Sequence, residues 1–349
     1  MINFSSITID AYVLKLIAEI DEFKGRWDAL GRLAPEKLIS LRRVATIESV
    51  GSSTRIEGAR LSDHEVETIL ANLEMRSFQS RDEEEVAGYA EAMNTIFDSW
   101  ERIPFTENYI KQLHGILLKY SSKDVAHRGD FKKFPNNVEA FDADGKSIGT
   151  IFETASPFDT PRLMTELIDC TTSALRERDM HPSLVIAAFL VHFLAIHPFQ
   201  DGNGRLSRVL TTLLLLKCGY RYAPYCSLER IVEENKDSYY RALRSSQRDI
   251  RSTRENIDDW VRFFLQTMKK QKDTLLHKIQ QEQLLSQLPP LSERILVLAK
   301  ERGRLTATET ATLLSINRNT AKLHFRQLVH KGHLIQHGAG KSTWYSPGR

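Results

Sequence analysis

Residues 197–208, with the sequence HPFQDGNGRLSR, carry more reactive and charged chemistry than any other stretch of this 349-residue chain. An apolar run at 184–191 precedes them and a second apolar run at 209–216 follows them. Long apolar runs are typical of buried helices, so the stretch predicts a loop that joins two core helices and opens the second one. The pattern indicates a mainly α fold.

The residue types in this loop suit a bound phosphate. Gly202 and Gly204 let the free N–H groups at the first turn of a helix come close to an anion. Arg205 and Arg208 add guanidinium groups that donate paired hydrogen bonds to phosphate oxygens. Asp201 offers a hard oxygen ligand of the kind that Mg²⁺ uses beside phosphates. The loop therefore predicts a site for a magnesium-bound nucleotide.

His197 adds a proton acceptor to the same loop. An imidazole with an ordinary pKa of ~6.5 can take a proton from a hydroxyl at neutral pH if it lies within hydrogen-bond reach. Taken singly, these residues have ordinary structural explanations, because Asp-Gly and Asn-Gly are common turn dipeptides. Their combination in this order favours a transfer reaction at phosphorus.

The stretch resembles the H-x-F-x-[D/E]-G-N-G-R-x-x-R signature of Fic domains at every defining position. The resemblance implies that His197 is the general base, that Phe199 packs the loop onto the core, and that Asp201 binds Mg²⁺. The remaining positions would bind the nucleotide. The anion hole for the α- and β-phosphates would be formed by Gly202, Asn203, Gly204 and Arg205. Arg208 would contact the γ-phosphate.

The usual reaction of Fic domains is transfer of AMP from ATP to a Ser, Thr or Tyr hydroxyl of a protein, with pyrophosphate leaving. The resemblance implies this reaction here, and it leaves the target protein open, the chain itself included. The related Doc proteins phosphorylate instead and replace the glycine-asparagine-glycine segment, which this chain keeps.

A second motif lies upstream, where Ser53 and Glu57 stand four residues apart and Gly58 follows. This pattern resembles the Fic inhibitory motif [S/T]-x-x-x-E-[G/N]. A helical stretch that begins near Pro35 would put both side chains on one helix face, and Gly58 can end the helix. A glutamate bonded to Arg208 would compete with the γ-phosphate, so we predict autoinhibition. The alternative is a capped helix with a surface glutamate.

Segments 137–141 and 148–152 flank an Asp-Gly turn signal at 142–145 and predict a β-hairpin. Its free edge could hold an extended peptide, as the flap of Fic domains does, or have no partner at all. Lys132 stands where the flap pattern of the family has arginine.

Further along, Asn235 and Tyr239 lie in a region that helps to wall the nucleotide base in Fic proteins, which makes them candidate adenine neighbours.

Composition bounds the remaining possibilities. The length suggests two or three domains. The spacing of the three cysteines fits neither a zinc site nor a disulfide framework, which favours a reducing compartment. The N-terminus lacks a signal-peptide pattern, and no run approaches the ~20 apolar residues of a membrane span. We therefore expect a cytoplasmic protein with no membrane partner, and the sequence leaves assembly into a homo-oligomer open.

Residues 290–349 differ in charge from the rest of the chain. They contain ten Lys and Arg against three Glu, a net charge of +7, whereas residues 1–289 carry −4. We expect three helices here, at 293–301 (capped by Ser292), 306–314 and 318–331. Leu313 and Phe325 are among the apolar positions of the last two. Strands are expected after them, at 333–336 and 343–346. This order resembles a winged helix-turn-helix.

In that fold the second helix of the pair enters the major groove of DNA. The residues expected to contact DNA are Arg318, Asn319, Thr320 and Lys322 on this helix and Lys341 in the wing. A protein-docking role for the module is the alternative.

We therefore predict a mainly α protein that combines a Fic-type helical core and its β-hairpin flap with a winged helix-turn-helix. The expected domains are an N-terminal helical region with the inhibitory motif (1–100), the Fic core (101–265), a helical linker (266–289) and the winged helix-turn-helix (290–349). The predicted function is protein adenylylation with ATP and Mg²⁺, autoinhibited by Glu57.

Two alternative functions remain. The chain could be a transcriptional regulator that senses a nucleotide and binds DNA, or a hydrolase that removes AMP from a modified protein with Glu57 orienting water. The intact His197 favours an enzyme, because a sensor needs the anion hole but not the base.

Overall fold

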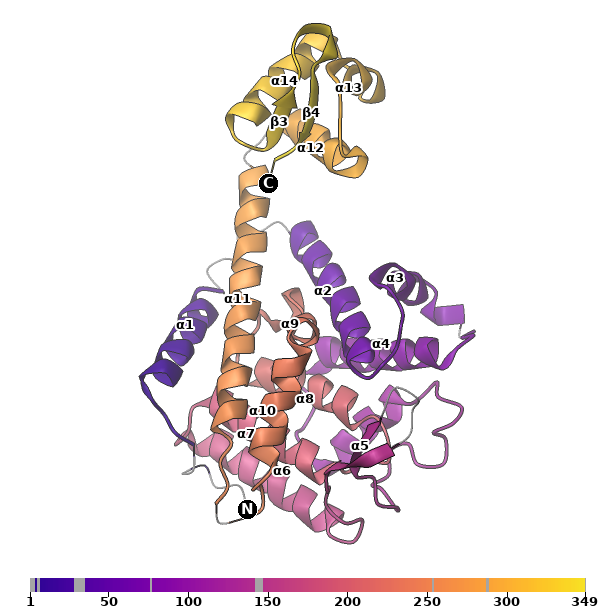
Figure 1. The fold of residues 1–349 in the computed structure, drawn as a ribbon, viewed down its shortest axis with the longest axis vertical. Helices are drawn as coiled ribbons and strands as arrows, with labels where there is room; N and C mark the ends of the chain where they lie inside the picture. Colours follow the sequence, from indigo (N-terminus) through magenta and orange to yellow (C-terminus); the bar gives the residue numbers. More distant parts are fainter. Residues whose placement is uncertain are drawn as a thin grey trace. The chain divides into compact units, whose positions relative to one another are not determined.

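The computed structural model describes residue 4 and residues 7–27, 35–75, 77–141, 147–252, 254–286 and 289–348. The described residues are mainly helical, with two short pairs of strands, as predicted (Figure 1). The chain divides into two compact units, residues 1–275 and residues 276–349.

The helices and strands of the first unit are α1 (Ala11–Trp27), α2 (Pro35–Ile56), α3 (Asp63–Ala71), α4 (Arg81–Ser99), α5 (Glu107–Leu117), β1 (Val138–Phe141), β2 (Ser147–Phe152), α6 (Thr160–Glu177), α7 (Pro182–Ile196), α8 (Asn203–Lys217), α9 (Leu228–Glu234), α10 (Lys236–Gln247) and most of α11 (Asp258–Ser286). The second unit holds the end of α11, then α12 (Pro290–Arg302), α13 (Ala307–Leu313), α14 (Arg318–His330), β3 (Leu334–His337) and β4 (Trp344–Pro347).

The core of the first unit is built on α7 and α8, the two buried helices that the apolar runs predicted. Every residue of α7 from Ser183 to Ile196 is buried, because this helix is apolar on all sides and needs neighbours all round. It packs against α6, α8 and α10. Residues 197–202 form the loop that joins these two helices, and residues 203–208 form the first turns of α8.

Helix α2 brings the upstream motif into the same core. It begins at Pro35 as predicted, it ends at Ile56, and Gly58 follows with a φ of 111°. Its last turns carry small buried residues and pack against α4, α8 and α9. The predicted N-terminal region and Fic core therefore lie in one compact unit, and α11 crosses the predicted boundary after residue 265 without interruption.

The predicted hairpin is present as an antiparallel pair of strands. In the register, Val138 lies opposite Phe152, and Phe141 lies opposite Ser147. The expected turn at 142–145 lies outside the described residues.

The second unit has its own apolar core, to which all three of its helices and both strands contribute. The rings of Phe325 on α14 and Tyr345 on β4 stack with centroids 4.0 Å apart. At the start of α13, Thr306 and Glu309 form a reciprocal capping box, which satisfies donors that the helix end leaves free.

Three details of this unit differ from the sequence-based expectation. Ser292 does not cap α12. It is buried inside the helix and shares a hydrogen bond of 2.7 Å with His324, because Pro290 fits the first helical position and starts the helix earlier. Leu313, expected in the core, is 43% exposed at the end of α13. Both strands begin one residue later than expected.

Across the segments that the structure describes, no helix has both the length and the apolar character needed to span a bilayer.

Close contact between α4 and α5 depends on a glycine. A Cβ at Gly88 would collide with the backbone carbonyl of Leu117, whereas a Cβ at Gly115 would meet nothing within 4 Å. Gly88→Ala should therefore push the two helices apart and destabilise the protein by about 1–3 kcal/mol, a typical cost of overpacking. Gly115→Ala is the matched control and should stabilise by about 0.5 kcal/mol. Urea unfolding of both variants checks this, and equal stabilities would contradict it.

Candidate active site

The loop between α7 and α8 is fixed by unusual backbone geometry at both ends. His197 follows α7 with a φ of 54°, and its N–H still donates to the carbonyl of Phe193 (2.9 Å). Gly202, with a φ of 78°, is the residue before the first turn of α8. A left-handed histidine is uncommon and suggests a functional constraint.

Asn203 and Phe199 hold the loop closed. The Asn203 amide accepts from the backbone N–H of Phe199 (2.9 Å) and donates to the Phe199 carbonyl (2.7 Å). The Phe199 side chain is fully buried, and its ring stacks on the ring of His114 with centroids 3.9 Å apart. Phe199 thus packs the loop onto the core, while the amide of Asn203 braces its backbone.

His114 on α5 supports the loop through a hydrogen bond to its backbone, a role that was not predicted from the sequence. Its Nδ1 accepts from the N–H of Gly129 (2.8 Å), so its Nε2 is protonated and donates to the backbone carbonyl of Asp201 (3.0 Å). Burial lowers the pKa of His114 to about 4, and the ring is neutral at pH 7. A polar residue among the apolar positions of an amphipathic helix was the available signal.

Lys132 supports the other end of the loop. Its ammonium donates to Asn136, to Thr154 and to the carbonyl of Ile196 at 2.8–3.0 Å. Asn136 in turn donates to the carbonyls of His197 (3.2 Å) and Phe199 (2.6 Å). The position that departs from the family's arginine is therefore a buried lysine that ties the base of the hairpin to the loop.

His197 is a neutral proton acceptor in this structure. Its Nδ1 lies 3.2 Å from the carbonyl of Leu194, which requires a proton on Nδ1 and leaves Nε2 free to accept one. Burial lowers the pKa of His197 to about 4. This arrangement has the protonation state that a general base needs at neutral pH.

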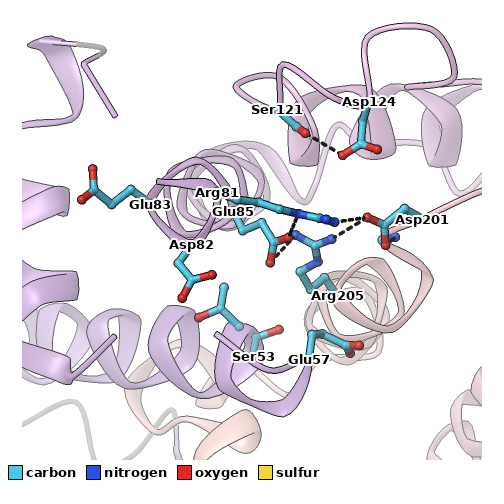
Figure 2. A network of polar contacts seen from close by, with 12 residues as sticks. Ser53, Glu57, Arg81, Asp82, Glu83, Glu85, Ser121, Asp124, Asp201 and Arg205 are labelled. Carbon is cyan, nitrogen blue, oxygen red and sulfur yellow. Dashed lines mark hydrogen bonds and ion pairs between the residues drawn. The ribbon is translucent and has the colours of Figure 1, made fainter. Parts of the chain in front are cut away.

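Asp201 and Arg205 belong to a network of ion pairs between the loop and α4 (Figure 2). Asp201 accepts from the N–H of Gly202 (2.6 Å) and from Arg81 (2.8 Å), and it lies 3.5 Å from Arg205. Arg205 also pairs with Glu85 (3.0 Å). Arg81 and Glu85 on α4 were not predicted as site residues, although their i,i+4 spacing is typical of a helical ion pair.

Arg208 on α8 contacts both residues of the upstream motif. Its Nε donates to the hydroxyl of Ser53 (2.8 Å), and its Nη2 donates to the Ser53 carbonyl (3.0 Å) and to Glu57 (2.6 Å). Burial opposes both charges, but their mutual attraction outweighs it, so the pKa of Glu57 is lowered and the pKa of Arg208 is raised. The pair is ionised at neutral pH.

The Glu57 carboxylate also covers the start of α8. A Cβ at position 204 would collide with it, so only glycine leaves room for this anion there. The Arg208 side chain is 8% exposed, and its Nη1 is buried with no hydrogen-bond acceptor among the described residues. The site therefore holds one anion and has a donor left for another.

The two candidate adenine neighbours differ in their surroundings. Tyr239 is buried and lines a small, largely apolar cavity of about 30 Å³ together with Arg208, Trp260 and Phe263. Asn235 does not line this cavity, and its amide donates to the carbonyl of Ile231 (2.7 Å).

The candidate DNA contacts lie in the second unit. Arg318, Asn319 and Lys322 on α14 are exposed, and Thr320 is half-buried. The side chain of Lys341 lies outside the described part of the chain.

Metal binding would depend on few protein ligands. The described residues contain no group of three or more His, Cys, Asp or Glu side chains placed to hold a metal. Asp201 is a partly exposed carboxylate beside the free N–H groups of α8, which fits a cation held mainly by substrate phosphates and water.

Part of this chain is similar to a known protein family. Residues 104–215 match the family model described as Fic/DOC family. The protein adenylyltransferase Fic of Drosophila willistoni is 28% identical over 265 residues, which cover 74% of this chain and 47% of that protein. The chain thus spans about half the length of the curated relatives that it matches.

Two solved structures share the fold. A Fic family protein from Desulfovibrio desulfuricans G20 is 21% identical with a TM-score of 0.63, over 98% of this chain and 97% of that one. A Fic domain containing signaling protein from Bacteroides thetaiotaomicron VPI-5482 is 24% identical with a TM-score of 0.61, over 75% of this chain and 97% of that one.

The family match covers the hairpin, α7, the loop and most of α8, whereas α2 and α4, which also contribute side chains to the site, lie outside it. The fold of the whole chain agrees with it. Residues 104–215 of this chain are thus similar to the Fic/DOC family, and the chain shares its fold with solved Fic proteins.

Proposed function

We propose that this protein transfers AMP from ATP to a hydroxyl of a protein side chain and that Glu57 inhibits the transfer within the same chain. The observation that carries the proposal is the 2.6 Å ion pair between Glu57 on α2 and Arg208 on α8, beside a loop that presents a neutral His197. Relatives named protein adenylyltransferase support the activity.

The reaction assigns one task to His197. The target hydroxyl loses its proton to Nε2 of His197, and its oxygen forms a bond to the α-phosphorus of ATP. The bond from the α-phosphorus to the bridging oxygen breaks, and pyrophosphate leaves with the electron pair. The fixed Nδ1 contact to Leu194 supports this assignment, because it leaves Nε2 as the accepting nitrogen.

The surroundings of Gly204 fit the phosphates of ATP. The N–H groups of the first turn of α8 have no acceptor within the helix, and the buried Nη1 of Arg208 is unpaired. Asp201 would hold Mg²⁺, which neutralises phosphate charge when it is bound. The hairpin edge would hold the target segment, and Tyr239 and Asn235 remain candidate neighbours of the adenine.

Inhibition follows from competition for one guanidinium. While Glu57 occupies Arg208 and the space above Gly204, a γ-phosphate cannot take the same donors. ATP would then bind with misplaced phosphates. Release of Glu57 restores both the cation and the space.

The first prediction tests transfer and inhibition with ATP labelled at the α- or the γ-phosphate. Removal of one partner of a buried ion pair costs ~3–5 kcal/mol. If about a third of that energy separates the blocked from the productive pose of ATP, the productive pose becomes ~10-fold more populated without Glu57. Glu57→Gly should therefore raise incorporation of the α-label at least ~10-fold. Adding His197→Ala should abolish incorporation but keep ATP binding. Label on the chain itself is the readout.

The controls separate the alternatives. Glu36→Gly changes an exposed glutamate in the first turn of the same helix and should have no effect on transfer. Arg208→Ala also breaks the pair but removes the phosphate ligand, so it should not activate. Label from the γ-phosphate would indicate phosphorylation. Nucleotide binding without label in any variant would favour a sensor, and loss of AMP from a modified protein would favour a hydrolase.

The second prediction concerns pH. Because burial lowers the pKa of His197 to about 4, the ring stays neutral over the physiological range, and protonation removes the base only as the pH falls toward 4. The single-turnover rate of label incorporation by Glu57→Gly should therefore be flat between about pH 6 and 8. An inflection near pH 6.5 would mean that His197 titrates as an exposed histidine.

We propose a second activity for residues 290–349, which is binding of duplex DNA by a winged helix-turn-helix. Its support is the row of exposed polar and basic residues Arg318, Asn319 and Lys322 on α14, in a segment with a net charge of +7. This row lies at the start of the helix, where recognition helices contact base edges.

The third prediction tests DNA binding by substitution. Arg318→Ala with Lys322→Ala should weaken binding to duplex DNA and lower the slope of log K against log salt by about 2, since each lost phosphate contact lowers it by about 1. Lys300→Ala with Arg302→Ala on α12 removes the same charge and is the control. An equal loss of DNA affinity in the two double variants would mean a non-specific effect of charge and would contradict a recognition helix at α14.

A further inference from the structure

Four charged side chains form a closed ring between the start of α4 and the loop (Figure 2). Arg81 pairs with Glu85 (2.8 Å) and with Asp201 (2.8 Å). Arg205 pairs with Glu85 (3.0 Å) and lies 3.5 Å from Asp201. Each carboxylate is thus shared by two guanidinium groups.

The two arginines of this ring are not equivalent. The side chain of Arg205 is 3% exposed, whereas that of Arg81 is 47% exposed. Arg81 is also the first residue of α4, where the helix dipole disfavours a cation. Arg81 can therefore swing into water without opening the core, and Arg205 cannot.

The contacts of Asp201 leave little room for another cation. Its Oδ1 accepts from Gly202, and its Oδ2 faces both arginines. A divalent cation on Oδ2 would share that oxygen with the Arg81 guanidinium, and the two positive charges would repel each other. Glu85 would stay paired with Arg205 after Arg81 leaves, so the loop keeps its support from α4.

We infer that Arg81 competes with the divalent cation for Asp201 and has to leave before the cation binds. Arg81 is then a positioning residue that holds the metal carboxylate in place while no metal is present. This inference rests on the proposed role of Asp201. It adds a second internal competitor to the site, since Glu57 competes with a phosphate and Arg81 competes with a metal.

Binding of Mn²⁺, followed by electron paramagnetic resonance with a non-hydrolysable ATP analogue present, tests this inference. The full-length chain is used, with Glu57→Gly in every variant so that the phosphates are free to bind. A half-exposed ion pair competes by a factor of about two to five, so Arg81→Met should lower the dissociation constant of Mn²⁺ by that factor. Arg81→Lys keeps the positive charge, so its dissociation constant for Mn²⁺ should stay closer to that of the parent protein.

Two further variants complete the design. Arg162→Met removes an exposed, ion-paired arginine on α6 and should leave Mn²⁺ binding unchanged. When Asp201→Asn is also present, Arg81→Met should not change the dissociation constant of Mn²⁺, because Arg81 then has no carboxylate at position 201 to release.

The outcomes separate the inference from the proposed function. If Asp201→Asn leaves Mn²⁺ binding unchanged, the metal site itself is wrong. If Asp201→Asn weakens Mn²⁺ binding while Arg81→Met leaves it unchanged or weaker, the metal site stands and the inference about Arg81 is overturned. Weaker binding of the nucleotide analogue to Arg81→Met without metal would also overturn it, since Arg81 would then be a phosphate ligand.

Discussion

A buried guanidinium has to be neutralised, and this requirement at Arg208 organises the site. Unpaired burial of a charge is costly, so a negative partner stabilises the buried Arg208. In this structure that partner is Glu57, Ser53 adds a neutral hydrogen bond, and both contacts tie α2 to α8. Under the proposed function, the γ-phosphate would take over the same role. Stability of the nucleotide-free protein and inhibition of its activity would then come from one ion pair.

The loop that carries His197 depends on residues from several elements. His114 from α5, with Lys132 and Asn136 from the segment before the hairpin, hold the backbone of the loop through hydrogen bonds to its carbonyls. Backbone carbonyls at the end of a helix need such donors when they are buried. The loop is therefore presented in a fixed conformation, which lowers the cost of positioning a reacting hydroxyl and a phosphate.

The C-terminal unit is stabilised by an apolar core, whereas the site of the first unit depends on buried ion pairs and hydrogen bonds. Its core is small and apolar, with the stack of Phe325 on Tyr345 joining α14 to β4. Apart from Leu323, the exposed residues of α14 are charged or polar. A separate core allows this unit to carry a function of its own, apart from the first unit, which contains the segment that matches the Fic/DOC family model.

The main helices, the hairpin and the chemistry of the loop could be predicted from the amino-acid sequence alone. The apolar runs predicted α7 and α8, the segments on either side of the Asp-Gly turn signal predicted the β1–β2 pair, and the spacing of Ser53 and Glu57 placed both on one helix face, because these features depend on neighbours along the chain. The contacts between side chains that are distant in the sequence became known only from the folded structure. The contacts of Arg208 with Glu57, of His114 with Asp201 and of Arg81 with Asp201 each join residues 87 or more positions apart. No local pattern encodes such pairs, because they depend on how the helices pack and on which charges burial leaves to be neutralised.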